Sequence, residues 1–143
     1  MALTGINIYE TKRFVSKLEK DKENPTVFHL GLLDPILRAE FEDESLIFEK
    51  SSSNPNDPAK ATIARSGFNI KAVRFGLKGM DNFLDPRTKE PMPFETVSVS
   101  IKGKNYNVAS EQIIKMLGKK LIEELAEEIL SENIFSEEEE KNS

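Results

Sequence analysis

The longest apolar pattern of the chain lies in residues 59–95 and predicts an amphipathic helix. Apolar side chains recur there at spacings of three, four and seven, which places them within one arc of a helical wheel. These positions are Ile63, Ile70, Val73, Leu77, Met80 and Leu84. Because proline has no backbone N–H and cannot continue a helix, we expect the helix to end before Pro86, Pro91 and Pro93.

After these prolines the pattern becomes alternating, which is typical of a half-buried strand. Val97, Val99 and Ile101 would face one way, with Thr and Ser between them. A Lys-Gly-Lys-Asn turn and a second short run from Tyr106 complete a predicted β-hairpin. A lone hairpin is marginally stable, so we expect this one to pack on a helix or to extend another sheet, such as one that contains residues 26–30.

A second helix pattern begins after Ser110, whose hydroxyl can cap it. Four glutamates between residues 123 and 128 form its acidic side, and Gly118 can divide it into two helices. Its apolar side consists of Ile114, Leu117, Leu121, Ile122, Leu125 and Ile129.

The N-terminal part contains shorter signals. Residues 9–22 carry Phe14, Val15 and Leu18 at helical spacing, which indicates a surface helix or a frayed arm. Residues 26–30 are β-branched and aromatic and therefore predict a strand.

Asp34 and Pro35 predict the start of a further helix, because Asp accepts hydrogen bonds from free amides and proline has no amide to satisfy. We expect this helix to bury Ile36, Leu37 and Phe41. The apolar residues 46–48 that follow fit either a strand or the end of this helix.

These elements predict an α+β fold with three to five helices packed on a small antiparallel sheet that contains a β-hairpin. We expect residues 1–131 to form a single domain, with a mobile loop at the Ser, Asn and Pro-rich residues 51–58. Residues 132–143 include four adjacent glutamates and are expected to be an acidic, disordered tail or a short frayed helix.

Composition narrows the class of protein. The chain has 143 residues and a net charge of -5, which argues against broad binding to a phosphate backbone. It has no cysteine, so a disulfide framework and a thiolate zinc site are excluded. We find no signal-peptide pattern and no apolar run long enough to span a bilayer, and we therefore expect a soluble cytoplasmic protein.

The sequence offers little catalytic chemistry. His29 is the only histidine, and no motif supplies the nucleophile and orienting group that a catalytic histidine needs. The acidic residues near Glu40 and the glutamates at 137–140 lack the ligand spacing of a calcium loop. The glycines at 76 and 79 do not form a phosphate-binding loop. We therefore expect no catalytic residue, no metal and no cofactor.

A basic stripe on the predicted first long helix is the clearest candidate surface. Phe68 and Phe75 border it, and its members are Lys60, Lys71, Arg74 and Lys78. The simplest interpretation is a solvated helix side, because long cations commonly line exposed faces. An alternative is a docking surface for an acidic partner, such as the acidic side of the last helix or the same surface on another subunit. A third, less favoured because of the negative net charge, is a nucleic-acid surface with stacking phenylalanines.

Three features together resemble a loose family of small tailed-bacteriophage proteins, the tail assembly chaperones or virion morphogenesis proteins. The first is NPTVFHL at residues 24–30, followed by the helix LLDPILRAEFED. The second is VRFGLKGMDNF at residues 73–83 with Asp85 and Pro93-Phe94, which is similar to a G-[LI]-x-G-[WM]-x-N…D…G-x-x-x-P-F pattern. The third is the amphipathic last helix and the ending FSEEEEKN. Met80 stands where the family commonly has Trp.

The resemblance implies a non-enzymatic protein that binds a tail protein, such as the tape measure, in the host cytoplasm during virion assembly. Such a protein would hold an amphipathic helix of its partner. The alternatives are a structural virion component, such as a connector or tail ring protein that assembles head to tail, and a small nucleic-acid binder. The residues we expect to bind the partner are Lys71, Arg74, Phe75, Lys78, Met80 and Phe83.

Overall fold

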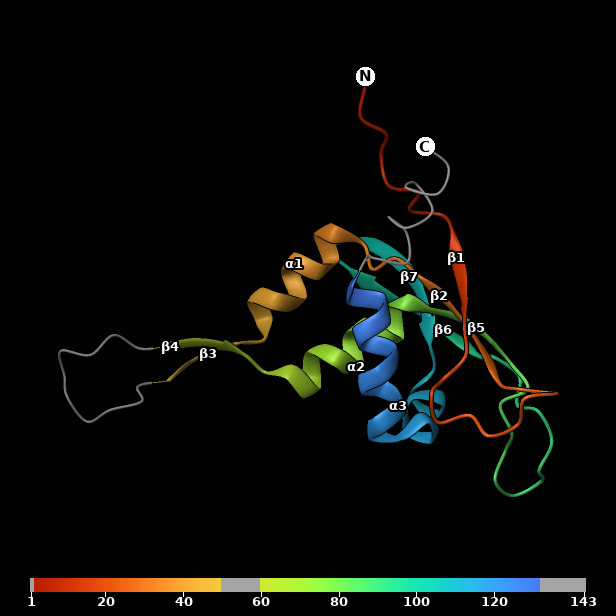
Figure 1. The fold of residues 1–143 in the computed structure, drawn as a ribbon. Coiled ribbons are helices and arrows are strands. Elements are labelled where there is room, and N and C mark those ends of the chain that lie inside the picture. The colour runs from red at the N-terminus through yellow and green to blue at the C-terminus, as the bar shows by residue number, and fades with distance from the viewer. Residues whose placement is uncertain (1, 50–59, 132–143) are drawn as a thin grey trace.

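The computed structural model describes residues 2–49 and 60–131, and these residues form the α+β fold expected from the sequence (Figure 1). The helices are α1 (Pro35–Glu44), α2 (Arg65–Gly76) and α3 (Glu111–Ser131). The strands are β1 (Thr11–Phe14), β2 (Val27–Gly31), β3 (Leu46–Glu49), β4 (Lys60–Ile63), β5 (Leu77–Asp81), β6 (Thr96–Ile101) and β7 (Lys104–Ala109).

The strands of the described residues make three small antiparallel sheets. The first has the order β1-β2-β5, and the pairs β3-β4 and β6-β7 make the other two. Helices α2 and α3 lie against each other, and α3 also contacts β2 (Figure 1). The strand expected at residues 26–30 is confirmed as β2, the central strand of the first sheet.

The pairing of β2 with β5 contains a register shift. Phe28 pairs with Met80 and His29 with Gly79, but Leu30 pairs with Leu77 rather than with Lys78. Lys78 is therefore an extra residue in β5, the arrangement of a β-bulge. In a regular strand, residues two apart share a face, and one inserted residue lets Leu77 and Met80 share the core face although they are three apart.

This bulge explains why the helix predicted through Leu84 is wrong. Helix α2 ends at Gly76, and Leu77 and Met80 belong to β5. Their spacing of three, which was read as helical, arises from the bulge in the strand. Of the other positions assigned to that helix face, Ile70 and Leu84 are exposed, whereas Val73 is buried within α2.

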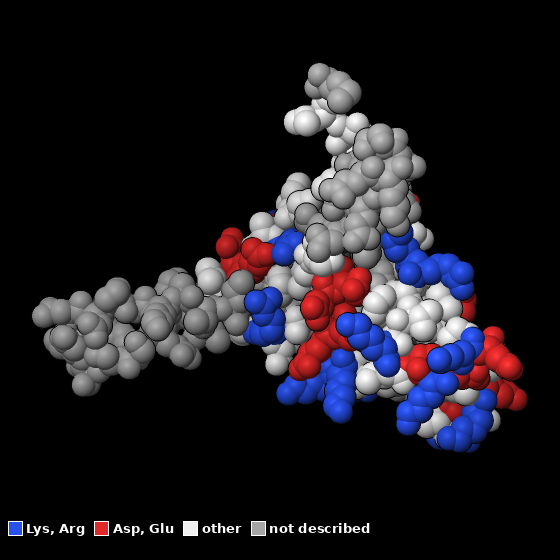
Figure 2. Space-filling view, in the orientation of Figure 1, with Lys and Arg blue, Asp and Glu red and all other residues white. Residues whose placement is uncertain are grey.

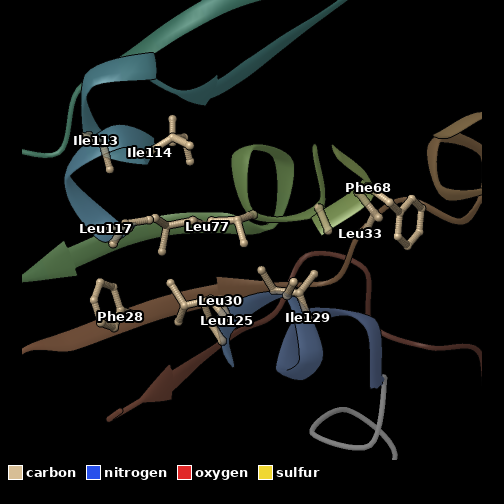
Figure 3. Packing of buried hydrophobic residues seen from close by; sticks show 14 of the residues in the cluster. Phe28, Leu30, Leu33, Phe68, Leu77, Ile113, Ile114, Leu117, Leu125 and Ile129 are labelled. Atoms are coloured by element: carbon tan, nitrogen blue, oxygen red, sulfur yellow. The ribbon is translucent and has the colours of Figure 1, made fainter. Parts of the chain in front are cut away.

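The core lies between the first sheet and helices α2 and α3. Figure 3 shows Leu30 of β2 beside Leu125 and Ile129 of α3, and these three side chains are fully buried. Leu77 and Val73 are buried in the same cluster, as expected. Apolar residues of the segment 59–95 and of the last helix therefore pack against each other in one core.

Helix α3 begins and bends as the sequence indicated. The backbone N–H of Ile113 donates to the Ser110 hydroxyl at 3.4 Å. Gly118 adopts φ 77° and ψ 166°, a conformation outside the helical region, and divides α3 into two helices. Of the apolar residues expected on its inner side, Leu121 and Ile122 are half-buried and the others are buried. No helix in the described ranges is long and apolar enough to cross a membrane.

The N-terminal segment differs from its expectation. Residues 11–14 form β1 on the edge of the first sheet, so the helical interpretation of residues 9–22 is wrong. After β1 the chain crosses to α3, where Glu124 accepts hydrogen bonds from the Ser16 hydroxyl and, at 3.0 Å, from the Lys17 backbone N–H. Part of the acidic side of α3 thus binds the N-terminal segment.

Helix α1 starts at the predicted position, where Asp34 accepts a hydrogen bond from the Ile36 backbone N–H at 2.8 Å. Leu37 and Phe41 are buried, but Ile36 is 74% exposed, so the expectation that it faces the core is wrong. The first turn of a helix is half open to solvent, and periodicity alone does not fix which of Ile36 and Leu37 turns inward.

Strand β3 follows α1 and pairs with β4 to form an arm that extends away from the other elements in Figure 1. The apolar residues 46–48 therefore belong to a strand. The loop expected at residues 51–58 and the tail expected at residues 132–143 lie outside the described residues.

The predicted hairpin is confirmed as β6 and β7. Its turn places Lys102 at φ 50° and Gly103 at φ 81°, the left-handed pair that matches the twist of a two-residue hairpin. The hairpin is a sheet of its own and packs through β7 against α2. The Lys102 ammonium also pairs with Glu40 of α1 at 2.6 Å, and this carboxylate raises the pKa of Lys102.

Two glycines of α2 provide a matched test of the packing. A Cβ on Gly76 would lie 2.6 Å from Cγ2 of the buried Ile129, whereas a Cβ on Gly67 would meet nothing within 4 Å. We expect Gly76→Ala to lower the free energy of unfolding by about 1–3 kcal/mol through overpacking. We expect Gly67→Ala to raise it by about 0.5–1 kcal/mol through helix propensity. Urea denaturation followed by circular dichroism measures both, and equal effects of the two substitutions would contradict the α2–α3 contact.

Candidate binding groove

The residues of the predicted basic stripe do not form one stripe on a single helix in the structure. The Lys71 ammonium pairs with Glu44 of α1 at 2.7 Å and lies 5.4 Å from the centre of the Phe41 ring. The Arg74 Nε donates to the Ala109 carbonyl at 3.2 Å and so joins α2 to the end of β7. Lys60 lies on β4, and its side chain is outside the described set. Neither Lys71 nor Arg74 pairs with α3, the internal acidic partner that the sequence suggested.

The apolar residues proposed for partner binding also separate. Met80 is 7% exposed and belongs to the core. Phe83 is half-buried, and its ring centre lies 5.9 Å from that of Phe28. Phe68, which was expected to border the stripe, is buried. Of the six proposed residues, the structure brings together only Phe75 and Lys78 in one surface hollow.

This hollow, here named the Lys78 groove, has a volume of about 610 Å³. It lies between residues 8 and 9 of the N-terminal segment, the β2–α1 connection with the first residues of α1, and Phe75, Lys78 and Tyr106. Its size falls within the range of about 300–1,000 Å³ that is typical of ligand-binding clefts. Four segments far apart in the sequence therefore build it.

Aromatic rings support one wall of the Lys78 groove. The Phe75 ring lies 5.0 Å from Phe41 of α1 and 5.8 Å from Tyr106 of β7, centre to centre, in tilted and edge-on arrangements. Such geometries are the favoured ones for aromatic pairs. Phe75 thus packs between Phe41 and Tyr106, and these rings form an apolar wall.

The rim of the Lys78 groove consists of exposed apolar side chains. Ile8 is 55% exposed, Tyr9 is 89% exposed and Ile36 is 74% exposed. Single exposed apolar residues are common, but several around one apolar hollow form a patch typical of interaction sites. Leu32, Leu33 and Leu37 are buried beneath them and close the groove from below.

Lys78 is the one cation of the groove lining, and the bulge places it there. Its stem lies across Gly31 of β2, where an added Cβ would come within 2.9 Å of Lys78 Cε. Lys78 as a whole is exposed, and the partial burial of its side chain lowers the pKa of Lys78 below its ordinary value. No described carboxylate pairs with it, and Asp34, the groove's one acid, caps α1.

The sequence identified only part of this groove. Phe75 and Lys78 were selected for a basic stripe on a helix, whereas they lie on an aromatic row and in a strand bulge. Tyr106 and Tyr9 were not selected, because nothing in the linear pattern shows that the N-terminal segment and the hairpin meet. Ile36 was expected to face the core, and nothing in the linear pattern indicated its exposure.

His29 has a structural environment. Its Nε2 lies 2.7 Å from an Asp81 carboxylate oxygen, and the two residues join β2 to β5 on the exposed side of the sheet. A catalytic histidine also needs a nucleophile, and no described hydroxyl is hydrogen-bonded to His29. Across residues 2–49 and 60–131, no group of three His, Cys, Asp or Glu side chains could hold a metal ion.

The surface charge is mixed. On the face shown in Figure 2, Lys and Arg side chains are interspersed with Asp and Glu and do not form one continuous basic surface. A nucleic-acid interface would need such a surface to follow a phosphate backbone. This face therefore gives no support to the nucleic-acid alternative.

Comparisons of the chain with protein-family models, with curated proteins and with solved structures found no match.

Neighbouring residues of α1 test the orientation of the groove rim. We expect Ile36→Ser to change the free energy of unfolding by no more than about 0.5 kcal/mol, because this side chain already lies in water. We expect Leu37→Ala to lower it by about 2–4 kcal/mol, because it removes buried methyl groups. Urea denaturation of both variants checks the assignment, and a larger loss for Ile36→Ser would mean that α1 is rotated relative to the structure.

Proposed function

We propose that this protein is a non-enzymatic, tail assembly chaperone-like protein of a tailed bacteriophage. In this proposal it binds an amphipathic helix of a tail protein, such as the tape measure protein, in the Lys78 groove during virion morphogenesis in the host cytoplasm. The observation that carries the binding role is the exposed apolar rim of Ile8, Tyr9 and Ile36 around a hollow with a buried leucine floor.

An amphipathic helix suits this hollow because it presents several apolar side chains along one stripe. Covering the rim would remove the exposed apolar surface of Tyr9 and Ile36 from water, at about 25 cal/mol per Å². The aromatic wall of Phe75 and Tyr106 is already packed without a ligand, and a preformed surface reduces the entropic cost of binding. Both effects support a binding function for this surface.

The assignment to phage tail assembly comes from the sequence resemblance. Residues 73–83, which are part of one of its three features, include the end of α2 and the bulged strand β5. Their glycines permit close contacts, since an added Cβ would meet Ile129 at position 76 and His29 at position 79. We interpret the glycines of this motif as residues that shape the fold, and Phe75 and Lys78 of the same motif as its contribution to the binding groove.

The binding role is tested with variants of the rim. The purified protein is mixed with the tail proteins encoded by the same phage, and the bound protein is identified by mass spectrometry. We expect Ile36→Glu to weaken that binding at least about tenfold, because it places a charge in an apolar contact. Val97→Glu is the matched control, because Val97 is 42% exposed on the hairpin and does not line the groove. Equal binding by the two variants would exclude the Lys78 groove as the contact.

Mass analysis of purified virions separates the chaperone from the structural alternative. A chaperone acts before assembly is complete, so we expect the protein to be absent from mature virions. A fixed copy number in the virion would instead identify a connector or tail ring protein. Retention of the protein in virions would contradict our proposal even if the groove binds a tail protein.

A further inference from the structure

The Lys78 ammonium is the one feature of the groove that an apolar ligand does not explain. We propose that Lys78 determines specificity, so that the groove accepts an apolar helical segment only when a Glu or Asp side chain of that segment reaches the ammonium. The inference rests on the proposed function in that it concerns the same groove. It adds the chemical class of the ligand: an apolar segment that carries an anion.

The backbone holds Lys78 in the groove. Because the bulge makes Lys78 the unpaired residue between Leu77 and Gly79, its side chain cannot exchange faces without shifting the buried Leu77 and Met80. The stem then lies on Gly31, where any larger residue would displace it. The bulge therefore places a cation in the Lys78 groove and interrupts the regular pairing of β5.

No described carboxylate forms an ion pair with that cation, although the Asp34 carboxylate lines the same groove. The titratable groups that line it besides Lys78 are the Asp34 carboxylate and the phenols of Tyr9 and Tyr106. Asp34 accepts a hydrogen bond from the Ile36 amide, and no described residue forms an ion pair with Lys78. Lys78 is exposed overall, and its lowered pKa reflects the partial burial of its side chain without an ion-pair partner.

A bound ligand would either leave the Lys78 ammonium unpaired in a less hydrated site or provide its ion-pair partner. A wholly apolar segment that covers the groove would remove further water from the ammonium and leave it unpaired, which is costly. A segment with a carboxylate beside its apolar residues would pair with the ammonium in a partly desolvated site, where charge pairing is stronger than in water. The groove therefore discriminates against neutral segments.

Two dyes with the same aromatic framework test this inference without knowledge of the natural partner. The anionic dye 8-anilinonaphthalene-1-sulfonate and the neutral dye N-phenyl-1-naphthylamine share one aromatic framework and differ by the sulfonate. We expect Lys78→Met to weaken binding of the anionic dye about tenfold, the effect of losing one charge-assisted contact. We expect it to leave the neutral dye within about twofold. Dye fluorescence at increasing protein concentration measures both affinities.

Two further variants keep the result interpretable. Lys78→Arg retains the charge and is expected to retain most of the binding of the anionic dye. Lys20→Met removes an exposed cation that does not line the groove, and it is expected to change neither affinity. Because the cation is replaced by an apolar side chain of similar length, Lys78→Met should keep the fold, which urea denaturation checks.

Three results would overturn the inference. The first is equal affinity of the anionic dye for the wild type and Lys78→Met. The second is an equal loss of both dyes in Lys78→Met, which would assign Lys78 a role in shape rather than in charge. The third is loss of the anionic dye only on substitution of Lys115 and Lys119, which line a separate hollow of about 450 Å³ between α2 and α3.

These results are independent of the proposed function. Charge selectivity for the dyes without binding of any tail protein would reject the phage role and leave the anion selectivity standing. Binding of a tail protein that Lys78→Met does not weaken would keep the role and reject the selectivity. Once a bound segment is identified, changing its Glu residues to Gln should produce the same loss as Lys78→Met.

Discussion

Where β2 pairs with β5, one residue too many lies between Leu77 and Gly79, and the chain accommodates it by a bulge. A regular strand would send Leu77 and Met80 to opposite faces, and one of them would leave the core. With the bulge both are buried against the helices, and the extra residue, Lys78, turns to the surface. The apolar core and the chemical character of the groove thus have one origin in the backbone.

The bulge in β5 is also the feature of the fold that could not be predicted from the sequence. Elements with independent local signals were correctly predicted, such as the capped start of α1 at Asp34, the alternating hairpin and the glycine bend at Gly118. Their signals involve few residues and do not depend on distant contacts. The end of α2 was missed because a bulged strand and a helix both place apolar residues three apart.

The groove was less accessible to sequence reasoning than the fold. Phe75 and Lys78 were selected, but Tyr9, Ile36 and Tyr106 come from segments whose meeting depends on tertiary packing. Lys71 and Arg74 were expected to bind a partner, and in the structure they contact Glu44 and the Ala109 carbonyl of neighbouring elements, which the linear pattern did not indicate. A helical wheel shows which side of a helix carries charged side chains, but it does not show whether a neighbouring element contacts them.

The ion pair between Lys102 and Glu40 has a consequence for the groove as well as for the hairpin. It joins the β6–β7 hairpin to α1, and these two elements contribute Tyr106 and Ile36 to the lining of the hollow. A contact outside the groove thus links two of the elements that line it. Because the Lys102 side chain is largely exposed, salt screens this ion pair, and the link that it makes between the hairpin and α1 weakens as ionic strength rises.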